Sequence, residues 1–279
     1  MPLALLLLGL IVARCALGAD VAAVPRDAPV YTALSIVNAA DNQSGALAPN
    51  SIGTIYGVNL AYSTAGVTES DVQGGSLPVM LGASETTVFI DYSPAALYYV
   101  SPTQINFLVP PNLLPGPVIV YVAVDSWHGS LLNLTLARAA PGLFQLAPGT
   151  CQLPSGADLE CAVATLADGW SVLTPSSPAR PGDIVILWAT GLGQTTPPAY
   201  NFQLPTAAAP LIAGANLEVL LDGVAVPSSA IEYAGVAPGY AGLYQINLLL
   251  PLSTGANPEI RLQLDGATSI PGVHLPVSP

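Results

Sequence analysis

The chain has 279 residues, of which 52% are hydrophobic and only 8% are charged, and its formal net charge is −12. It contains no lysine, and phosphate backbones and anionic membranes repel so acidic a chain, which argues against nucleic-acid binding. The 28 prolines and 26 glycines are spread along the whole chain, where they interrupt helices and separate short strands, so the composition predicts an all-β protein.

Residues 1–18 predict a secretory signal peptide. An apolar run from Leu3 to Val12 is too short to span a bilayer comfortably, and small residues then lead to Gly18, where a signal peptidase could cut. The run lacks a basic start, and Arg14 follows it, so an uncleaved anchor is the alternative. Cleavage would leave an N-terminal extension at residues 19–33 and place the protein outside the cell, secreted or at the cell surface. No later segment is apolar over enough residues to insert into a membrane.

A motif occurs twice, as PTQINFLVP at residues 102–110 and as LYQINLLLP at residues 243–251. In each half an aromatic-bearing strand is expected before the motif, at Ile90 in the first half and at residues 231–233 in the second. Similar motif order and spacing indicate a tandem duplication.

Short apolar stretches alternate with turn residues at intervals of about 8–12 residues, which is typical of antiparallel β-sandwiches. We predict two tandem immunoglobulin-like β-sandwich units, at residues 34–140 and 178–279. The connection at residues 141–177 is predicted to be ordered and to contain a hairpin that turns at Asp168-Gly169.

Two cysteines in this connection, Cys151 and Cys161, bracket a polar stretch with a proline and a glycine. In an oxidising compartment they predict a disulfide that closes a small loop. Without histidines nearby they make a poor zinc site, and neither a metal nor a cofactor is expected. Phe144 and Trp170 indicate that the connection packs against one or both units.

Alternation within the motif sends its amide side chains to one face of the strand and its apolar side chains to the other. Beside tyrosines, these amides could hydrogen-bond to sugars and the tyrosine rings could stack on them. Alternatively, they tie down neighbouring backbone at a strand edge or between the units, a reading that the duplication favours. The candidate binding residues are Gln104, Asn106, Gln245, Asn247, Tyr99 and Tyr244, with Tyr98 and Tyr240 nearby.

No catalytic residue is predicted. His128 and His274 are expected to be solvated, and the chain has neither G-x-S-x-G nor a phosphate loop. The acidic residues are scattered singly and mostly lie beside turn residues, where aspartate is favoured for local hydrogen bonding. Trp188 is expected in a core and Trp127 on the surface. Because a glycosidase needs only two carboxylates, a polysaccharide hydrolase stays an alternative.

Several longer stretches are similar to a known family: IVNAADNQSGALAPNSIGTIYGVNLA, LYYVSPTQINFLVP, AAPGLF, PARPGDIVILWATGLGQTTPP and YAGVAPGYAGLYQINLLLP. From about Ser35 to about Gly266 the chain resembles the C-terminal domain of large secreted proteins of Solibacter and related Acidobacteria, a family without an assigned activity. Each unit is also similar to the IPT/TIG class of immunoglobulin-like modules. The resemblance implies an immunoglobulin-like fold and an extracellular location, and it carries over no catalytic residues.

The sequence therefore predicts a secreted, non-enzymatic binding or structural module. Its expected partner is envelope or extracellular polysaccharide, or another secreted protein, and its oligomeric state is left open. A secreted polysaccharide hydrolase and a ligand-free spacer are the alternatives.

Overall fold

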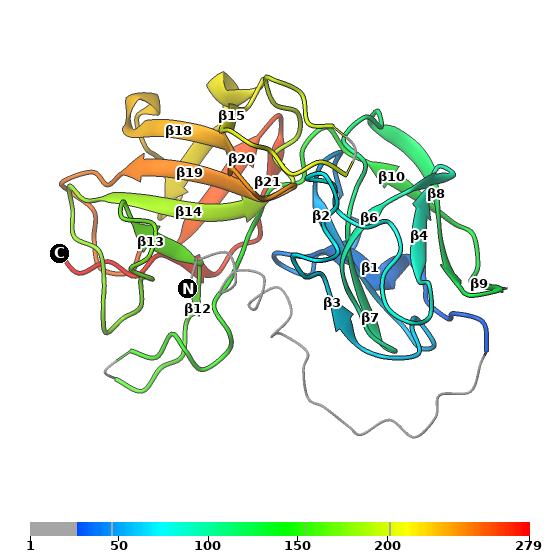
Figure 1. Ribbon diagram of the computed structural model, residues 1–279. Coiled ribbons are helices and arrows are strands. Elements are labelled where there is room, and N and C mark those ends of the chain that lie inside the picture. Colours follow the sequence, from blue (N-terminus) through cyan, green and yellow to red (C-terminus); the bar gives the residue numbers. More distant parts are fainter. Residues whose placement is uncertain (1–26, 46, 154, 201) are drawn as a thin grey trace.

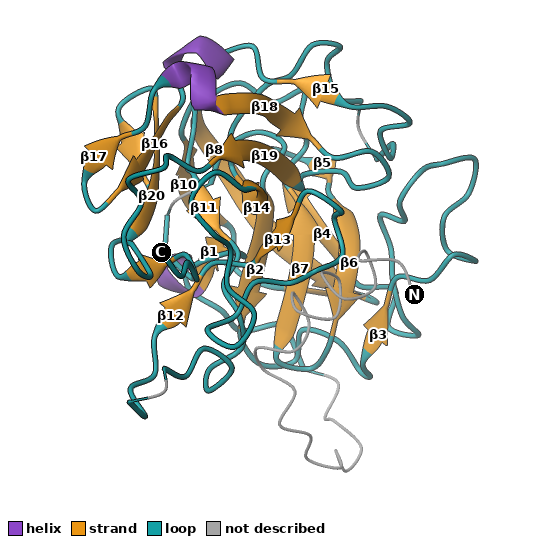
Figure 2. Cartoon of the chain, turned by 90° about the vertical axis from the view of Figure 1, so that its left-hand side faces the viewer, coloured by secondary structure: helices purple, strands orange, loops and turns teal. Residues whose placement is uncertain are grey.

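The computed structural model describes residues 27–45, 47–153, 155–200 and 202–279 (Figure 1). Within these ranges the chain forms strands and no α-helix, and Figure 2 shows helical ribbon only at short turns. The predicted all-β class is confirmed. In the same ranges no helix is long and apolar enough to cross a membrane, and the predicted signal peptide at residues 1–18 lies outside them. The helical turns are η1 (Ala33–Ser35), η2 (Gly214–Asn216) and η3 (Ser228–Ala230).

The first half of the chain forms a sandwich of two sheets, called here the first sandwich. Their strand orders are β1-β2-β7-β6-β3 and β10-β8-β4-β5, and β9 pairs with β8. The strands of the first sheet are β1 (Ile36–Asn38), β2 (Ile52–Tyr56), β3 (Ala65–Gly66), β6 (Ala96–Val100) and β7 (Gln104–Leu108). Those of the other sheet are β4 (Thr87–Ile90), β5 (Ser93–Pro94), β8 (Gly116–Val124), β9 (Trp127–His128) and β10 (Leu132–Leu136).

The second half forms another sandwich, the second sandwich. In one of its sheets β14 is followed by β19, β18 and β15, and both β11 and β13 pair with β14; the other sheet has the order β17-β16-β20-β21. The strands of the first of these sheets are β11 (Gly142–Leu143), β13 (Ala164–Leu166), β14 (Ile184–Thr190), β15 (Ala209–Pro210), β18 (Ile231–Val236) and β19 (Tyr244–Leu249). Those of the other are β16 (Glu218–Leu221), β17 (Val224–Ala225), β20 (Ile260–Leu264) and β21 (Ala267–Thr268).

The two sandwiches share one strand arrangement, since β13-β14-β19-β18-β15 repeats β1-β2-β7-β6-β3 and β17-β16-β20-β21 repeats β5-β4-β8-β9. Both sandwiches also have a shift in strand register at the same place. Between β6 and β7 the shift falls just before Tyr99, which lies opposite Asn106, and between β18 and β19 it falls just before Tyr233, which lies opposite Asn247. The predicted equivalence of Ile90 with residues 231–233 is wrong. Strand pairing makes β6 the counterpart of β18, and Ile90, at the end of β4, the counterpart of the end of β16.

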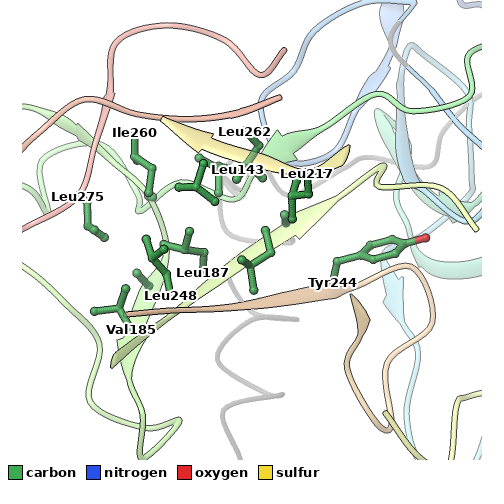
Figure 3. Packing of buried hydrophobic residues seen from close by; sticks show 14 of the residues in the cluster. Leu143, Val185, Leu187, Leu217, Tyr244, Leu248, Ile260, Leu262 and Leu275 are labelled. Carbon is green, nitrogen blue, oxygen red and sulfur yellow. The ribbon is translucent and has the colours of Figure 1, made fainter. Parts of the chain in front are cut away.

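Each sandwich encloses its own apolar core because strand alternation turns every second side chain inward. In the first core, Val88 and Val120 from one sheet meet Ile105 and Phe107 from the other. In the second core, leucine and isoleucine side chains from facing strands pack together, and Tyr244 lies at one end with its hydroxyl pointing away from them (Figure 3).

A third apolar cluster joins the two sandwiches, and we call it the junction core. It fixes the first sheet of each sandwich against the other, so both faces of these sheets are covered over much of their length. Its buried residues are Ala40, Ile52, Leu77, Ala96, Tyr98, Leu108, Phe144, Leu146, Cys151, Cys161, Val163, Ile186, Trp188, Ala237, Ala241 and Leu243.

The connection at residues 141–177 is part of the second sandwich, because its strands β11 and β13 both pair with β14. Its hairpin forms as predicted: the Leu166 amide donates to the Ser171 carbonyl across the Asp168-Gly169 turn. Phe144 is buried, as expected, whereas the expectation for Trp170 is wrong because that side chain is 59% exposed. The division into domains at residues 34–140 and 178–279 stays a prediction.

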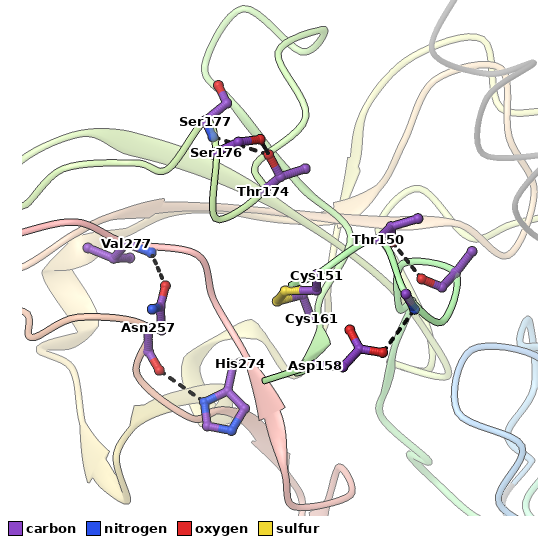
Figure 4. Close-up of a disulfide and its surroundings, with 12 residues drawn as sticks. Thr150, Cys151, Asp158, Cys161, Thr174, Ser176, Ser177, Asn257, His274 and Val277 are labelled. Carbon is purple, nitrogen blue, oxygen red and sulfur yellow. Dashed lines mark hydrogen bonds between the residues drawn. A yellow bond between two sulfur atoms is a disulfide. The ribbon is translucent and has the colours of Figure 1, made fainter. Parts of the chain in front are cut away.

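The predicted disulfide between Cys151 and Cys161 is present, with a Cα–Cα distance of 6.0 Å (Figure 4). Within its loop, Asp158 accepts a hydrogen bond of 3.0 Å from the amide of Gly149. β12 (Glu160–Cys161) pairs with β22 (Val273–His274) in parallel, whereas every other pairing of described strands is antiparallel. The disulfide therefore holds the loop beside the C-terminal strand.

Candidate functional site

The two Gln-Ile-Asn motifs make the same internal contact. In each copy the glutamine side-chain amide donates a 2.9 Å hydrogen bond to the asparagine oxygen two residues later, from Gln104 to Asn106 and from Gln245 to Asn247. Residues two apart on a strand lie on one face, so the spacing allows this contact. Each motif thus uses one donor of its glutamine and one acceptor site of its asparagine internally.

The first copy is buried. Asn106 has 0% and Gln104 5% of its surface exposed, and the Asn106 oxygen also accepts a 3.1 Å hydrogen bond from the hydroxyl of Thr54 on β2. Both side chains lie on the face of β7 that also carries Leu108 of the junction core. Gln104 and Asn106 therefore offer almost no surface to a ligand.

The second copy is half-buried. Gln245 lies opposite Trp188 and Asn247 lies opposite Ile186, and both of these β14 side chains belong to the junction core. Gln245 and Asn247 thus lie next to the junction core, with part of their surface in solvent. Their role in binding stays a prediction.

The tyrosines named as candidates are not assembled on a common surface. Tyr244 is 0% exposed and Tyr98 and Tyr99 are buried; Tyr240 alone of the four is half-buried. Burial raises the pKa of Tyr98 and of Tyr244, as expected for phenols held away from water. The expected surface of amides and tyrosines therefore lies largely inside the molecule: Tyr98 is part of the junction core, and Tyr244 belongs to the core of the second sandwich.

The polar groups of this region bridge the two sandwiches. Thr190 on β14 accepts a 2.9 Å hydrogen bond from the amide of Ile52 and donates a 2.7 Å bond to the carbonyl of Gly242. The Tyr98 hydroxyl donates a 2.6 Å bond to the carbonyl of Ala241. The reading that these buried groups tie down backbone between the units agrees with these contacts.

The residues that could take part in catalysis or metal binding do not come together in one site. His128 is exposed on β9, and Nδ1 of His274 lies 2.9 Å from the carbonyl oxygen of Asn257 (Figure 4). Over the described ranges no three His, Cys, Asp or Glu side chains lie close enough to hold a metal ion.

Several aspartates lie in turns, as the sequence indicated. Asp168 accepts hydrogen bonds from the Ser171 hydroxyl and from the amides of Ser171 and Trp170, and these bonds lower the pKa of its carboxyl group. Asp91, Asp125, Asp222 and Asp265 each begin a two-residue hairpin loop with positive φ.

A group of rings at the surface, of which Phe89 and Tyr121 are half-buried and Tyr92 and His128 are exposed, was not predicted from the sequence. Phe89 on β4 stacks on Tyr121 of β8 with 4.7 Å between ring centroids, and Tyr92 and His128 each meet Tyr121 edge-on at 6.4 Å. We call these four residues the aromatic patch. The alternation of VFI (88–90) and VIVYV (118–122) would have placed Phe89 and Tyr121 on one outer face, had the two strands been paired.

Two grooves flank the junction. One, of about 220 Å³, is lined by Asn50, Pro197, Tyr200 and Pro205; the other, of about 480 Å³, is lined by Leu114, Arg138, Ile212 and Asp265. Neither groove contains a residue of the Gln-Ile-Asn motifs or of the aromatic patch.

The similarities to known proteins are distant. The surface glycan-binding protein PbSGBP-B from Prevotella bryantii is 12% identical with a TM-score of 0.23, covering 88% of this chain and 41% of its own. SGBP-B of the Bacteroides ovatus mixed-linkage glucan utilization locus is 10% identical with a TM-score of 0.32, covering 92% of this chain and 46% of its own. The Escherichia coli adhesin FdeC is 11% identical with a TM-score of 0.21, covering 92% and 66%.

This chain spans less than half the length of the first two of these structures. No family model matches the sequence, and no curated protein aligns with it significantly. The function is therefore inferred from the residues of this chain.

Proposed function

We propose that the protein is a secreted, non-enzymatic module of the cell exterior that binds extracellular polysaccharide or another secreted protein. The observation that carries the proposal is the filled junction. Active sites and ligand pockets occur preferentially where domains meet. Here the centre of the meeting surface is closed by the apolar side chains of the junction core and by hydrogen bonds between the sandwiches, and the two grooves lie at its edges.

Because the junction is filled, we expect the protein to bind its partner on the outer faces of the two sandwiches. No hinge is needed for such a function, and the hydrogen bonds from Asn50 to Tyr244 and from Ile52 to Thr190 oppose opening between the sandwiches. Buried hydrogen bonds are expensive to break without replacement, so the two sandwiches are expected to move together.

The disulfide supports an extracellular location, because disulfides persist in oxidising compartments. Membership of the secreted acidobacterial family that the motifs resemble is part of the same proposal. The engagement of Asp168 and the hairpin aspartates in turns supports a binding role over a hydrolase.

The test measures both binding of the protein to polysaccharide and hydrolysis of that polysaccharide. The purified chain without its predicted signal peptide is mixed with insoluble polysaccharides and with envelopes of the source organism, and both the bound fraction and the release of reducing sugar ends are measured. Retention without release supports the proposal. Sustained release of reducing ends would establish the hydrolase instead, and the absence of both retention and release would favour the ligand-free spacer.

A further inference from the structure

The aromatic patch lies on the sheet that is farthest from the second sandwich. In Figure 1, β4, β8 and β9 form the outer side of the first sandwich, opposite the strands of the second. Val88, Ile90, Val120 and Val122 point into the first core, so alternation turns Phe89 and Tyr121 outward. The sheet places aromatic rings on a face that the rest of the described chain leaves half-open.

The four rings of the aromatic patch contact one another through Tyr121. Tyr121 lies at the centre, stacked on Phe89 at an interplanar angle of 10° and met edge-on by Tyr92 and His128. Trp127, next to His128, is also exposed. Clustered exposed rings on a monomer surface mark binding sites more often than scattered single ones. Their mutual contacts reduce the side-chain freedom that a ligand has to remove on binding.

Tyr92 occupies a backbone position that suits glycine. It is the second residue of the two-residue loop between β4 and β5, with a φ of +62°. The counterpart loop between β16 and β17 has Gly223 there, with a φ of +77°. A side chain with a Cβ is strained in this region, and the second sandwich shows that the loop forms with glycine.

The Tyr92 side chain does not compensate by packing in a core, because it is 64% exposed. Its ring meets that of Tyr121 edge-on, within the patch. Strained positions are retained where the residue has a role that the fold itself does not require. The tyrosine at this position supplies an accessible ring beside Tyr121 that the fold itself does not require.

The chemistry of the patch fits an uncharged sugar chain. The C–H groups on one face of a pyranose ring are apolar and weakly positive, and they pack on the negative face of an aromatic ring. The acidic residues Asp91 and Asp125 flank the patch, and the chain carries a net charge of −12, so an anionic polysaccharide would be repelled. Resting on the proposed function, we infer that the aromatic patch is the site at which this protein binds a neutral polysaccharide.

The experiment measures retention on microcrystalline cellulose, chitin, mannan and starch as neutral polymers, on polygalacturonate as an anionic polymer and on chitosan as a cationic one. Four proteins are compared: the parent, Tyr92→Gly, Tyr121→Ala and Tyr200→Ala. Tyr200 is as exposed as Tyr92 and lies outside the patch, so Tyr200→Ala is the matched control. Thermal unfolding confirms that each protein is folded.

Tyr92→Gly separates binding from folding. We expect it to raise the melting temperature, because glycine relieves the positive φ, and to weaken retention on a neutral polymer about tenfold. Tyr121→Ala should weaken retention at least as much, and Tyr200→Ala should retain the parent affinity.

Parent-like retention of Tyr92→Gly and Tyr121→Ala would overturn the assignment of the site and leave the proposed function standing. Retention of the parent only on polygalacturonate or only on chitosan would overturn the ligand class. Absence of parent retention on every polymer overturns this inference, and retention on envelopes then decides separately whether the proposed function survives.

Discussion

The side-chain amide of Asn50, in the first sandwich, donates a 2.9 Å hydrogen bond to the hydroxyl of Tyr244, in the second. That hydroxyl in turn donates to the carbonyl of Gly193. The two residues are 194 positions apart in sequence, and both side chains are buried. One hydroxyl therefore satisfies a donor from one sandwich and an acceptor from the other.

Tyr244→Phe keeps the ring and removes this hydroxyl. The Asn50 amide and the Gly193 carbonyl would then be buried without this partner, so the variant should lose about 1–3 kcal/mol of unfolding free energy. Urea unfolding monitored by circular dichroism measures the loss. Tyr200→Phe, at an exposed position, should be neutral, and equal effects in the two variants would contradict the role given to the Tyr244 hydroxyl.

Gly242 and Gly239 form a matched pair at the junction. Both have positive φ, +72° and +83°, but a Cβ on Gly242 would lie 2.6 Å from Leu108 and 2.9 Å from Ile52, whereas one on Gly239 would meet nothing within 4 Å. Gly239→Ala should cost about 1–2 kcal/mol from backbone strain alone. Gly242→Ala should cost about 1–3 kcal/mol more because it overpacks the junction. Similar denaturation midpoints for the two variants would show that the sandwiches separate easily.

The two motif asparagines should differ in their effect on stability. Asn106 is fully buried and its oxygen accepts bonds from Gln104 and Thr54, whereas Asn247 is half-buried and accepts from Gln245. Asn106→Ala should therefore cost about 2–3 kcal/mol and Asn247→Ala about 1 kcal/mol or less. Denaturant titration of each variant tests the order. If Asn247→Ala is the more damaging substitution, the structural account of the motif fails.

Removal of the disulfide should destabilise the connection. The cross-link closes a loop between residues 10 apart, for which loop-closure entropy gives about 3 kcal/mol. Cys151→Ser/Cys161→Ser should lose up to that amount, and the chain without residues 1–18 should show no titratable thiol under denaturing, non-reducing conditions. Gln152→Ala, an exposed change in the same loop, should leave the melting temperature unchanged.

Alkaline pH should destabilise the fold through its buried tyrosines. Burial raises the pKa of Tyr31 from 10.0 to about 12, against the opposing effect of the hydrogen bond from the Val122 amide. Because the folded pKa exceeds the unfolded one, this contribution to stability is complete below about pH 10 and is lost as the pH rises toward the folded value. Urea midpoints should be flat up to about pH 9 and then fall. Tyr98→Phe, which removes a second phenol of raised pKa, should make the fall shallower.

Local physical rules explain what the sequence predicted correctly. The predicted hairpin at Asp168-Gly169 forms because Gly169 adopts a φ of +72°, which glycine tolerates, and this backbone preference acts within a few residues. Cys151 and Cys161 are also close in sequence, and together with the oxidising compartment that the signal peptide implies, this spacing predicted their pairing. The assignment of Ile90 to the wrong strand pair arose because motif spacing does not reveal which strands are hydrogen-bonded to each other.

By itself, the sequence determined the strand content and the turns, since these depend on period-two alternation and on short-range backbone preferences. It also determined the duplication, from repeated motifs, and the disulfide, from two cysteines close together in the chain. Only the tertiary structure decided which strand faces are covered. Strand alternation puts Gln104 and Asn106 on the face of β7 that points away from the first core. It likewise puts Phe89 on the face of β4 that points away from that core. The face of β7 that carries Gln104 and Asn106 is covered, whereas Phe89 and Tyr121 stay half-buried and Tyr92 is exposed, because side-chain burial depends on surfaces brought together from distant parts of the chain.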